Sequence, residues 1–292
     1  MFCRSDRAIF GANAMTEPQG GADIENLDLL KGSTIRTTAD RDGDEWVING
    51  HKLWPTNSGG AADLFGVVCT TGKAGSSDPR DFAFIFVPAD LPGVTQGGPY
   101  QKAGMAADKN GDIWFEDVRV PLWYRACGPG DDFLYFKEVV TFGLLASVAF
   151  ASGVMLDVFE LLRDFASTTS YRGRPLKEND DVAGVLADVA TTTEVVRLLG
   201  TRIAAMVDRP DLYGDPWSEG VVARARAYKY FACDQVVLAL RRAMDVMGVH
   251  GSDRARDVEK HWRDFKIVQL WMGGKQLCQM EAARWFFDCK TL

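Results

Sequence analysis

Two short stretches in the first third of the chain combine hydroxyl, indole and glycine residues in a way that is unusual for surface loops. They are residues 15–23, MTEPQGGAD, and residues 54–59, WPTNSG. The hydroxyls of Thr16 and Thr56 can hydrogen-bond to the polar edge of a ring-shaped ligand, and the indole of Trp54 offers a flat face against it. The same residues can also serve as a turn bond and as core packing, so both interpretations stay open at this point.

Other residue types that carry chemistry are isolated in the sequence. The three histidines, His51, His250 and His261, are dispersed, and no H-E-x-x-H or C-x-x-C motif accompanies them, so we expect no zinc or other metal site. Ser58 lies in no G-x-S-x-G motif, which argues against a hydrolase nucleophile. The two stretches described above therefore remain the strongest candidates for a functional site.

Composition and charge exclude several classes of protein. The chain has 292 residues and a net charge of −7, which gives no cationic surface excess to attract nucleic acid. Its six cysteines are scattered and its first residues lack an apolar signal core, so we expect reduced thiols and a cytoplasmic location. Residues 139–156 carry no charge, and we interpret them as a fully buried bundle helix rather than a membrane span.

The periodicity of apolar residues changes near residue 128 and predicts two domains, 1–128 and 129–292. The first domain alternates like β-structure, with Asn49-Gly50 read as a hairpin turn, and we expect an antiparallel barrel or sandwich. Its predicted strands are residues 34–39, 45–48, 51–54, 64–70, 81–88 and 111–120. The second domain has helical spacing and predicts a four-helix bundle. Its predicted helices are residues 132–168, 178–207, 215–247 and 258–288.

Three ordered motifs resemble those of the acyl-CoA dehydrogenase family. Residues 15–23 resemble its T-E-P-x-x-G-S-D stretch, residues 54–59 resemble its W-I-T-N-G stretch, and residues 258–267 are similar to its V-E-x-x-x-R-D-x-K-I helix start. The resemblance implies an α+β multidomain protein whose middle β-domain and C-terminal helical bundle hold FAD. It also implies α,β-dehydrogenation of an acyl-CoA thioester, in which a base removes the α-proton and the β-hydrogen leaves as hydride to the flavin.

The resemblance also carries binding roles onto particular residues. Ala22 replaces the serine that helps to bind the thioester in the family, which makes it a weak candidate for substrate binding. The implied FAD-binding positions are Met15, Thr16, Trp54, Thr56, Gly248 and Gln276.

The catalytic base of the family has no counterpart in this sequence. Most members place a glutamate eight residues after the R-D pair, and that position is Met272, whose thioether cannot accept a proton at neutral pH. Other members place it on the first bundle helix, where this chain has Gly143. Glu138 lies on the same predicted helix and could act only if the register slips, so the catalytic residue stays unknown.

Three functions remain open from the sequence. Only fifteen residues precede Thr16, where the family has a helical N-terminal domain. We therefore favour a dehydrogenase subunit that forms a homo- or hetero-oligomer with another acyl-CoA dehydrogenase-type chain. In this interpretation the other chain supplies the base. The alternatives are a base-less, flavin monooxygenase-like enzyme and a non-catalytic structural subunit.

The aromatic residues near the C-terminus are interpreted as core and subunit interface. They are Trp262, Trp271, Trp285, Phe286 and Phe287.

Overall fold

A computed structural model describes residues 6–25 and 35–290, without the side chains of Ala22 and Asp23. The described residues form two compact units, one made of residues 6–25, 35–102 and 106–139, and the other made of residues 103–105 and 140–290. The division at residue 139 falls inside a long helix, α2 (Asp131–Thr168). The domain boundary predicted at residue 128 stays a prediction.

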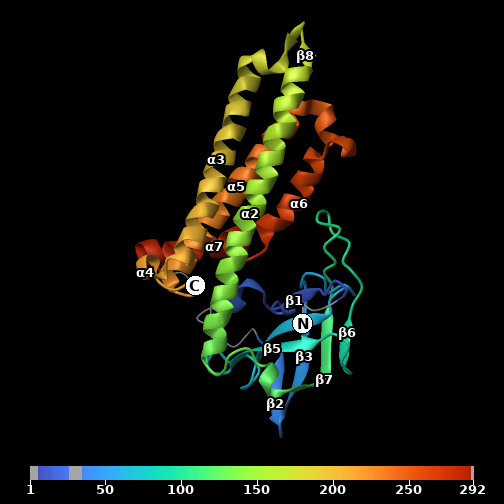
Figure 1. The fold of residues 1–292 in the computed structure, drawn as a ribbon, viewed down its shortest axis with the longest axis vertical. Helices are drawn as coiled ribbons and strands as arrows, with labels where there is room; N and C mark the ends of the chain where they lie inside the picture. Colours follow the sequence, from blue (N-terminus) through green and yellow to red (C-terminus); the bar gives the residue numbers. More distant parts are fainter. Residues whose placement is uncertain (1–5, 26–34, 291–292) are drawn as a thin grey trace. The chain divides into compact units, whose positions relative to one another are not determined.

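The first unit contains a seven-stranded curled sheet in the order β1-β4-β2-β3-β7-β6, with β5 paired to β4 (Figure 1). Most neighbours are antiparallel, but β1 and β2 both pair with β4 in parallel, so the sheet is mixed rather than purely antiparallel. The strands are β1 (Gly11–Ala14), β2 (Thr38–Asp42), β3 (Glu45–Lys52), β4 (Leu64–Thr70), β5 (Phe82–Pro88), β6 (Val94–Gln96) and β7 (Ile113–Pro121). Short helical turns are η2 (Ala22–Glu25) and η3 (Leu122–Tyr124).

The hairpin turn predicted at Asn49-Gly50 is wrong. Strand β3 runs straight through these residues and carries a bulge between Ile48 and Gly50 in its pairing with β7. A Cβ at Gly50 would collide with the side chain of Thr37, so the glycine here permits a close approach instead of a turn. The chain reverses earlier, at Gly43, which has a left-handed φ of 60° between β2 and β3.

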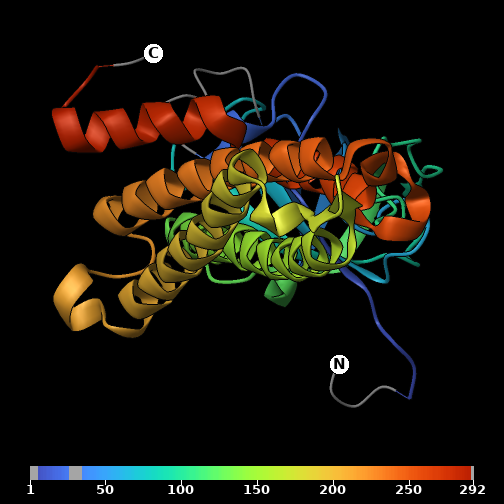
Figure 2. The same ribbon diagram turned by 90° about the horizontal axis from the view of Figure 1, so that it is seen from above.

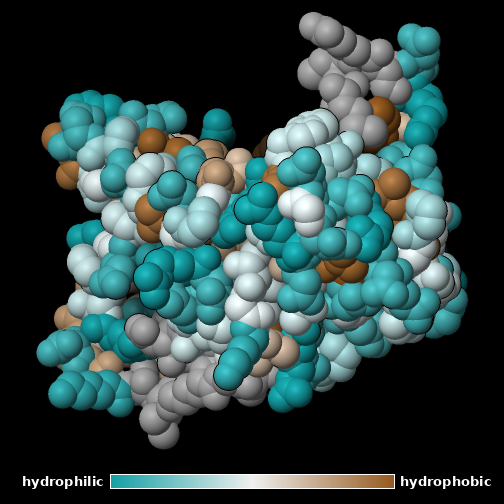
Figure 3. Space-filling view, turned by 90° about the horizontal axis from the view of Figure 1, so that it is seen from below, coloured by the Kyte–Doolittle hydropathy of each residue, from teal (hydrophilic) through white to brown (hydrophobic). Residues whose placement is uncertain are grey.

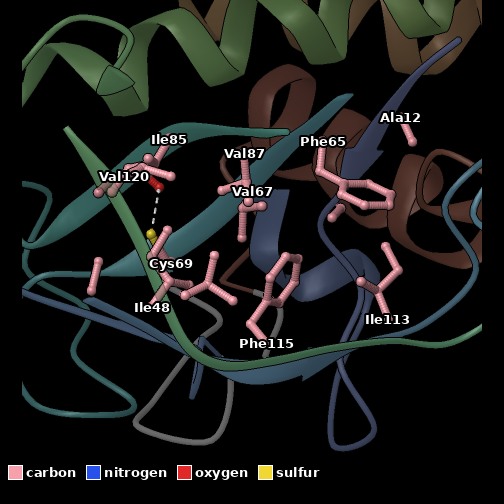
Figure 4. Packing of buried hydrophobic residues seen from close by; sticks show 14 of the residues in the cluster. Ala12, Ile48, Phe65, Val67, Cys69, Ile85, Val87, Ile113, Phe115 and Val120 are labelled. Atoms are coloured by element: carbon pink, nitrogen blue, oxygen red, sulfur yellow. Dashed lines mark hydrogen bonds between the residues drawn. The ribbon is translucent and has the colours of Figure 1, made fainter. Parts of the chain in front are cut away.

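Apolar side chains from one face of the curled sheet form the core of this unit (Figure 4). Phe65 and Phe115 meet edge to face with their ring centroids 6.1 Å apart. The thiol of Cys69 donates to the carbonyl of Ala83 on the neighbouring strand, and burial raises the pKa of this thiol to about 12. Cys69 is therefore a core residue, and the sheet is a rigid base for the loops at its edges.

The second unit is helical, and Figures 1 and 2 agree in showing α2, α3 and α5 side by side, with a small hairpin where α2 passes to α3. In addition to α2, the helices are α3 (Asp180–Asp208), α4 (Pro210–Tyr213), α5 (Glu219–Met247), α6 (Val258–Leu270) and α7 (Gly274–Phe287). The short elements are β8 (Ser170–Tyr171), β9 (Arg174–Pro175), η4 (Leu176–Glu178), η5 (Gly248–Ser252) and η6 (Arg254–Arg256).

Helix α2 is buried along one side only, which corrects the prediction of a fully buried helix. Val140, Leu144 and Val148 are buried at helical spacing, whereas Phe142 and Phe150 are about half exposed. In the described part of the chain, α2 is the one helix long and apolar enough to cross a membrane. Because the core helix of a bundle meets the same criteria, length and composition alone are weak grounds for a span.

The last predicted helix, residues 258–288, is two helices with a turn at residues 271–273. Met272 and Gly273 both have left-handed φ values, 48° and 82°, which an α-helix cannot accommodate. The aromatic residues at the end of α7 lie on the surface of the chain, with Phe287 80% exposed, so they are not core residues. On the face drawn in Figure 3, hydrophilic residues predominate and hydrophobic ones are scattered.

Candidate functional site

The fold brings the two motif stretches of the β-unit together. The amide of Leu53 donates to the carbonyl oxygen of Thr16 at 2.8 Å, and the ammonium group of Lys52 donates to the carbonyl oxygen of Met15 at 3.0 Å. Four of the predicted FAD-binding positions, Met15, Thr16, Trp54 and Thr56, therefore lie on two segments that are hydrogen-bonded to each other.

A buried ion pair fixes these two segments. Glu17 Oε1 lies 2.7 Å from Lys52 Nζ, and the two side chains are 1% and 0% exposed. Glu17 also accepts hydrogen bonds from the hydroxyl of Thr37 at 2.8 Å and from the amide of Arg36 at 2.7 Å. Burial opposes ionisation of Glu17, but Lys52 and the backbone amides of Arg36 and Thr37 outweigh it and hold the pKa of the carboxyl below its ordinary value. The pair is a structural anchor for the motif.

Trp54 presents its indole to solvent from a constrained backbone. The side chain is 51% exposed, and the residue has a left-handed φ of 68°, which is rare for a bulky residue. Asn110 Nδ2 donates to the carbonyl oxygen of Trp54 at 2.7 Å, and the ring of Tyr100 packs against the indole with centroids 4.2 Å apart. Neither Tyr100 nor Asn110 was a sequence candidate, because each lies about fifty residues further along the chain and in no motif.

The two predicted hydroxyls complete this part of the site. Thr56 is exposed at the start of the turn after Trp54, and Thr16 is half buried against Gly21. A half-exposed indole beside two hydroxyls can hold a flat ring with a polar edge, so these residues fit a flavin. Ala22 lies in η2, and its side chain falls outside the described ones.

In the helical unit, the structure brings the two predicted base positions to the same place. A Cβ built at Gly143 on α2 would lie 2.5 Å from Cε and 3.0 Å from Sδ of Met272. The thioether therefore fills the space in which a side chain at residue 143 would begin. The two predicted base positions meet here, and neither residue carries a carboxylate.

The groups around Met272 are hydrogen-bonded to one another. Trp271 Nε1 donates to Ser147 Oγ at 2.8 Å, and that hydroxyl donates to the carbonyl oxygen of Gly143, also at 2.8 Å. From α5 the buried Lys229 donates to the carbonyl oxygen of Trp271 at 2.7 Å. A thioether, an indole and a hydroxyl do not take up a proton at neutral pH, and the Lys229 amine is engaged as a donor to the carbonyl oxygens of Gln269 and Trp271, so we assign no general base in this cluster.

Glu138 does not reach this cluster through α2. Five residues separate it from Gly143, which corresponds to about 500° of rotation on an α-helix, so it projects from a different side. We therefore leave the catalytic residue unassigned in this chain.

Gly248 and Gln276 lie far apart within the helical unit. Gly248 ends α5 with a left-handed φ of 57°, whereas Gln276 lies in the first turn of α7. The neighbour of Gln276, Lys275, pairs with Asp234 on α5 at 2.5 Å. Asp234 and Gly248 are about 21 Å apart along the helix at 1.5 Å per residue. The two predicted positions are thus exposed at separate places on one chain.

The Arg263-Asp264 pair of the third motif is hydrogen-bonded to the main chain of residues 103–105. Arg263 Nη1 donates to the carbonyl oxygen of Ala103 at 3.1 Å, and Asp264 accepts a hydrogen bond from the amide of Met105. Glu259 and Lys260 pair with the same two side chains one turn earlier on α6. The motif therefore fixes loop 103–105 and contributes no acid or base to the Met272 cluster.

Comparison with protein families matches the chain to two successive domains. Residues 12–118 match the acyl-CoA dehydrogenase middle domain, and residues 133–286 match the acyl-CoA dehydrogenase C-terminal domain. The chain is 29% identical to the cyclohexane-1-carbonyl-CoA dehydrogenase of Geobacter metallireducens, covering 96% of this chain and 68% of the relative. It is 30% identical to an acyl-CoA dehydrogenase of Bacillus subtilis, covering 91% of this chain and 65% of that protein.

Solved structures agree with these matches. The crystal structure of acyl-CoA dehydrogenase from Geobacillus kaustophilus superposes with a TM-score of 0.82 at 26% identity, covering 96% of this chain and 69% of that one. The chain thus spans about two thirds of the length of the relatives it matches. It belongs to the acyl-CoA dehydrogenase family, whose members are FAD-dependent oxidoreductases.

Proposed function

We propose that the chain is a flavoprotein subunit that takes part in α,β-dehydrogenation of an acyl-CoA thioester, in an assembly whose partner chain supplies the base. The observation that carries the proposal is the contact of the Met272 thioether with Gly143, where two possible positions for the base coincide and neither bears a carboxylate. The cytoplasm is the location that we propose for the assembly.

The β-unit contributes the residues that hold the cofactor. The half-exposed indole of Trp54 would stack on a bound flavin ring, and Thr16 and Thr56 would offer hydroxyls to its polar edge. When bound, FAD supplies the acceptor for the hydride that leaves the β-carbon. The α-proton needs a separate acceptor, and in this proposal that acceptor is a carboxylate of the partner chain.

The separation of Gly248 from Gln276 supports an oligomer. In the family the cofactor spans a subunit interface. Gln276 follows Lys275, which pairs with Asp234 about 21 Å along α5 from Gly248, so the two positions can contact cofactors at different interfaces. The assembly can include a second copy of this chain at the cofactor site as well as a different acyl-CoA dehydrogenase-type chain. A second copy brings the same Met272, so the base requires a different chain.

The test is to purify the chain together with its partners and to record the visible spectrum, the co-eluting chains and thioester oxidation. We expect a flavin spectrum and a second dehydrogenase-type chain with a glutamate at the position of Met272 or Gly143. Replacing that glutamate with glutamine should abolish turnover and keep the flavin. A colourless, solitary chain would contradict the proposal and favour a non-catalytic structural role.

The monooxygenase-like alternative makes a different prediction for the same preparation. In this alternative the chain carries flavin without a partner, consumes oxygen when a flavin reductase is added, and does not oxidise thioesters. That result would favour a monooxygenase-like enzyme over the dehydrogenase. Oxidation of the thioester only when the second chain is present would exclude this alternative.

A further inference from the structure

We infer that Tyr100 is a positioning residue that sets the orientation of Trp54 and, through it, of the flavin ring. This inference rests on the proposed function, which places the flavin on Trp54. Tyr100 belongs to no motif of the sequence, and the structure alone connects it with the site.

The first observation is the contact between the two rings. The ring of Tyr100 packs against the indole with centroids 4.2 Å apart and planes inclined at 50°, while about half of the Trp54 side chain remains exposed. An aromatic side chain held from one side by another ring has fewer orientations available to it. The exposed part of the indole is the part that a planar ligand can cover.

The second observation is that Tyr100 is itself fixed at both ends. Its amide donates to the carbonyl oxygen of Asn110 at 2.8 Å, and its phenol donates to Asp112 Oδ2 at 2.9 Å. The other oxygen of Asp112 lies 2.7 Å from His51 Nε2, and the His51 ring stacks on Trp114 with centroids 4.9 Å apart. Burial and the bond to Asp112 raise the pKa of Tyr100 to about 12, so its phenol keeps the proton that makes this bond.

The third observation is that the same loop holds the backbone of Trp54. Asn110 donates to the carbonyl oxygen of Trp54 and accepts a hydrogen bond from the buried Lys102, which also pairs with Asp108. Residues 100–112 therefore fix the left-handed backbone of Trp54 through Asn110 and its ring through Tyr100. An orientation held by two independent contacts indicates a preorganised platform for a ligand.

The experiment measures FAD affinity and the visible circular dichroism of bound flavin in the full chain with its partners. Replacing Tyr100 with leucine should raise the Kd for FAD by about threefold to tenfold, the range expected for one aromatic pair, and should change the flavin dichroism. Tyr100→Phe keeps the ring and should restore the affinity to within about twofold of the wild type. Trp123→Leu is the matched control, because Trp123 is an exposed aromatic residue of the same unit whose ring packs on Tyr124.

A double variant separates positioning from an independent effect. In a Trp54→Ala background, Tyr100→Leu should have no further effect on the Kd for FAD. If Tyr100→Leu raises the Kd for FAD as much in the Trp54→Ala background as in the wild type, the inference is wrong. The inference is also wrong if Trp54→Ala weakens binding but Tyr100→Leu alone changes neither the Kd nor the dichroism. If Trp54→Ala itself changes neither property, the proposed flavin site fails, and this outcome is distinct from the other two.

Discussion

The S-methyl group of Met272 lies where a side chain on Gly143 would begin, with Cε 2.5 Å from the position of a Cβ at that residue. The two residues are far apart in the sequence and complementary in space. Glycine at residue 143 leaves the space that the end of the Met272 side chain occupies.

The first prediction concerns this complementarity. Gly143→Ala should lose part of the stability that alanine brings to an open helix position, about 0.5–1 kcal/mol, because the flexible end of the Met272 side chain must shift away from the added methyl group. Met272→Ala in the same chain should remove most of that loss, as measured by urea unfolding of the single and double variants. Gly153→Ala is the control on the same helix, since a Cβ there meets open space and should not destabilise the protein. Equal effects at the two glycines would contradict the packing explanation.

The second prediction is that Met272→Ala leaves dehydrogenase turnover of the assembly nearly intact. The thioether has no role in proton transfer, so kcat should stay within about tenfold of the wild type, which corresponds to less than about 1.4 kcal/mol in the barrier. Steady-state kinetics with the partner chain present gives the measurement. A loss of several orders of magnitude would count against a base on the partner.

The third prediction is that Trp54→Ala weakens retention of FAD by about 1 kcal/mol or more, because the ring loses its stacking surface. The flavin content after dialysis and the Kd for FAD measure the effect. Trp123→Ala removes an exposed indole of the same unit and should leave both unchanged. Unchanged flavin content in Trp54→Ala would refute the assignment of the indole.

The fourth prediction concerns the buried pair Glu17–Lys52. Glu17→Gln leaves the Lys52 ammonium buried without its counter-charge and should destabilise the β-unit by about 3–5 kcal/mol. Replacing both residues, by Glu17→Gln with Lys52→Met, should cost less than the single change. Urea unfolding of the wild type, the single variant and the double variant tests this order of stability. An exposed ion pair would not produce it.

The same pair predicts how stability depends on pH. The pKa of Glu17 is lowered in the folded chain, so its contribution is fully present above the ordinary value of 4.5 and is lost as the pH falls through the lower, folded value. The difference in unfolding free energy between the wild type and Glu17→Gln, measured from pH 7 down to pH 3, should therefore narrow towards the acid end, because a protonated Glu17 is as uncharged as the glutamine. A constant difference across that range would contradict the linkage.

Motif residues show what sequence reasoning could and could not supply. The T-E-P and W-x-T-N stretches contain Thr16 and Trp54. The alternating pattern predicted a strand at residues 51–54 but none at β1, which precedes Thr16, so the contact between the two stretches could not be derived from it. The Asn49-Gly50 pair misled because its turn preference is local, whereas the close approach of Thr37 to Gly50 depends on a strand pairing that no local pattern reports.

Tyr100, Asn110 and the break between α6 and α7 were not predicted for a different reason. Tyr100 and Asn110 act on Trp54 through contacts between segments about fifty residues apart, and their types are unremarkable in a loop. The break between α6 and α7 was missed because the apolar pattern continues across Trp271 and Met272, whereas the backbone turns left-handed at Met272 and Gly273. Sequence periodicity reports which face is apolar, but it does not report where three-dimensional packing interrupts a helix.

The turn that carries Met272 is held through its main chain. Lys229 binds the carbonyl oxygen of Trp271, and the Cys278 thiol donates to the carbonyl oxygen of Met272 at 3.5 Å. Since neither bond involves the side chain of residue 272, the residue type there can change during evolution while the turn persists. Gain or loss of a carboxylate at this position is therefore a poor measure of how distantly two such chains are related.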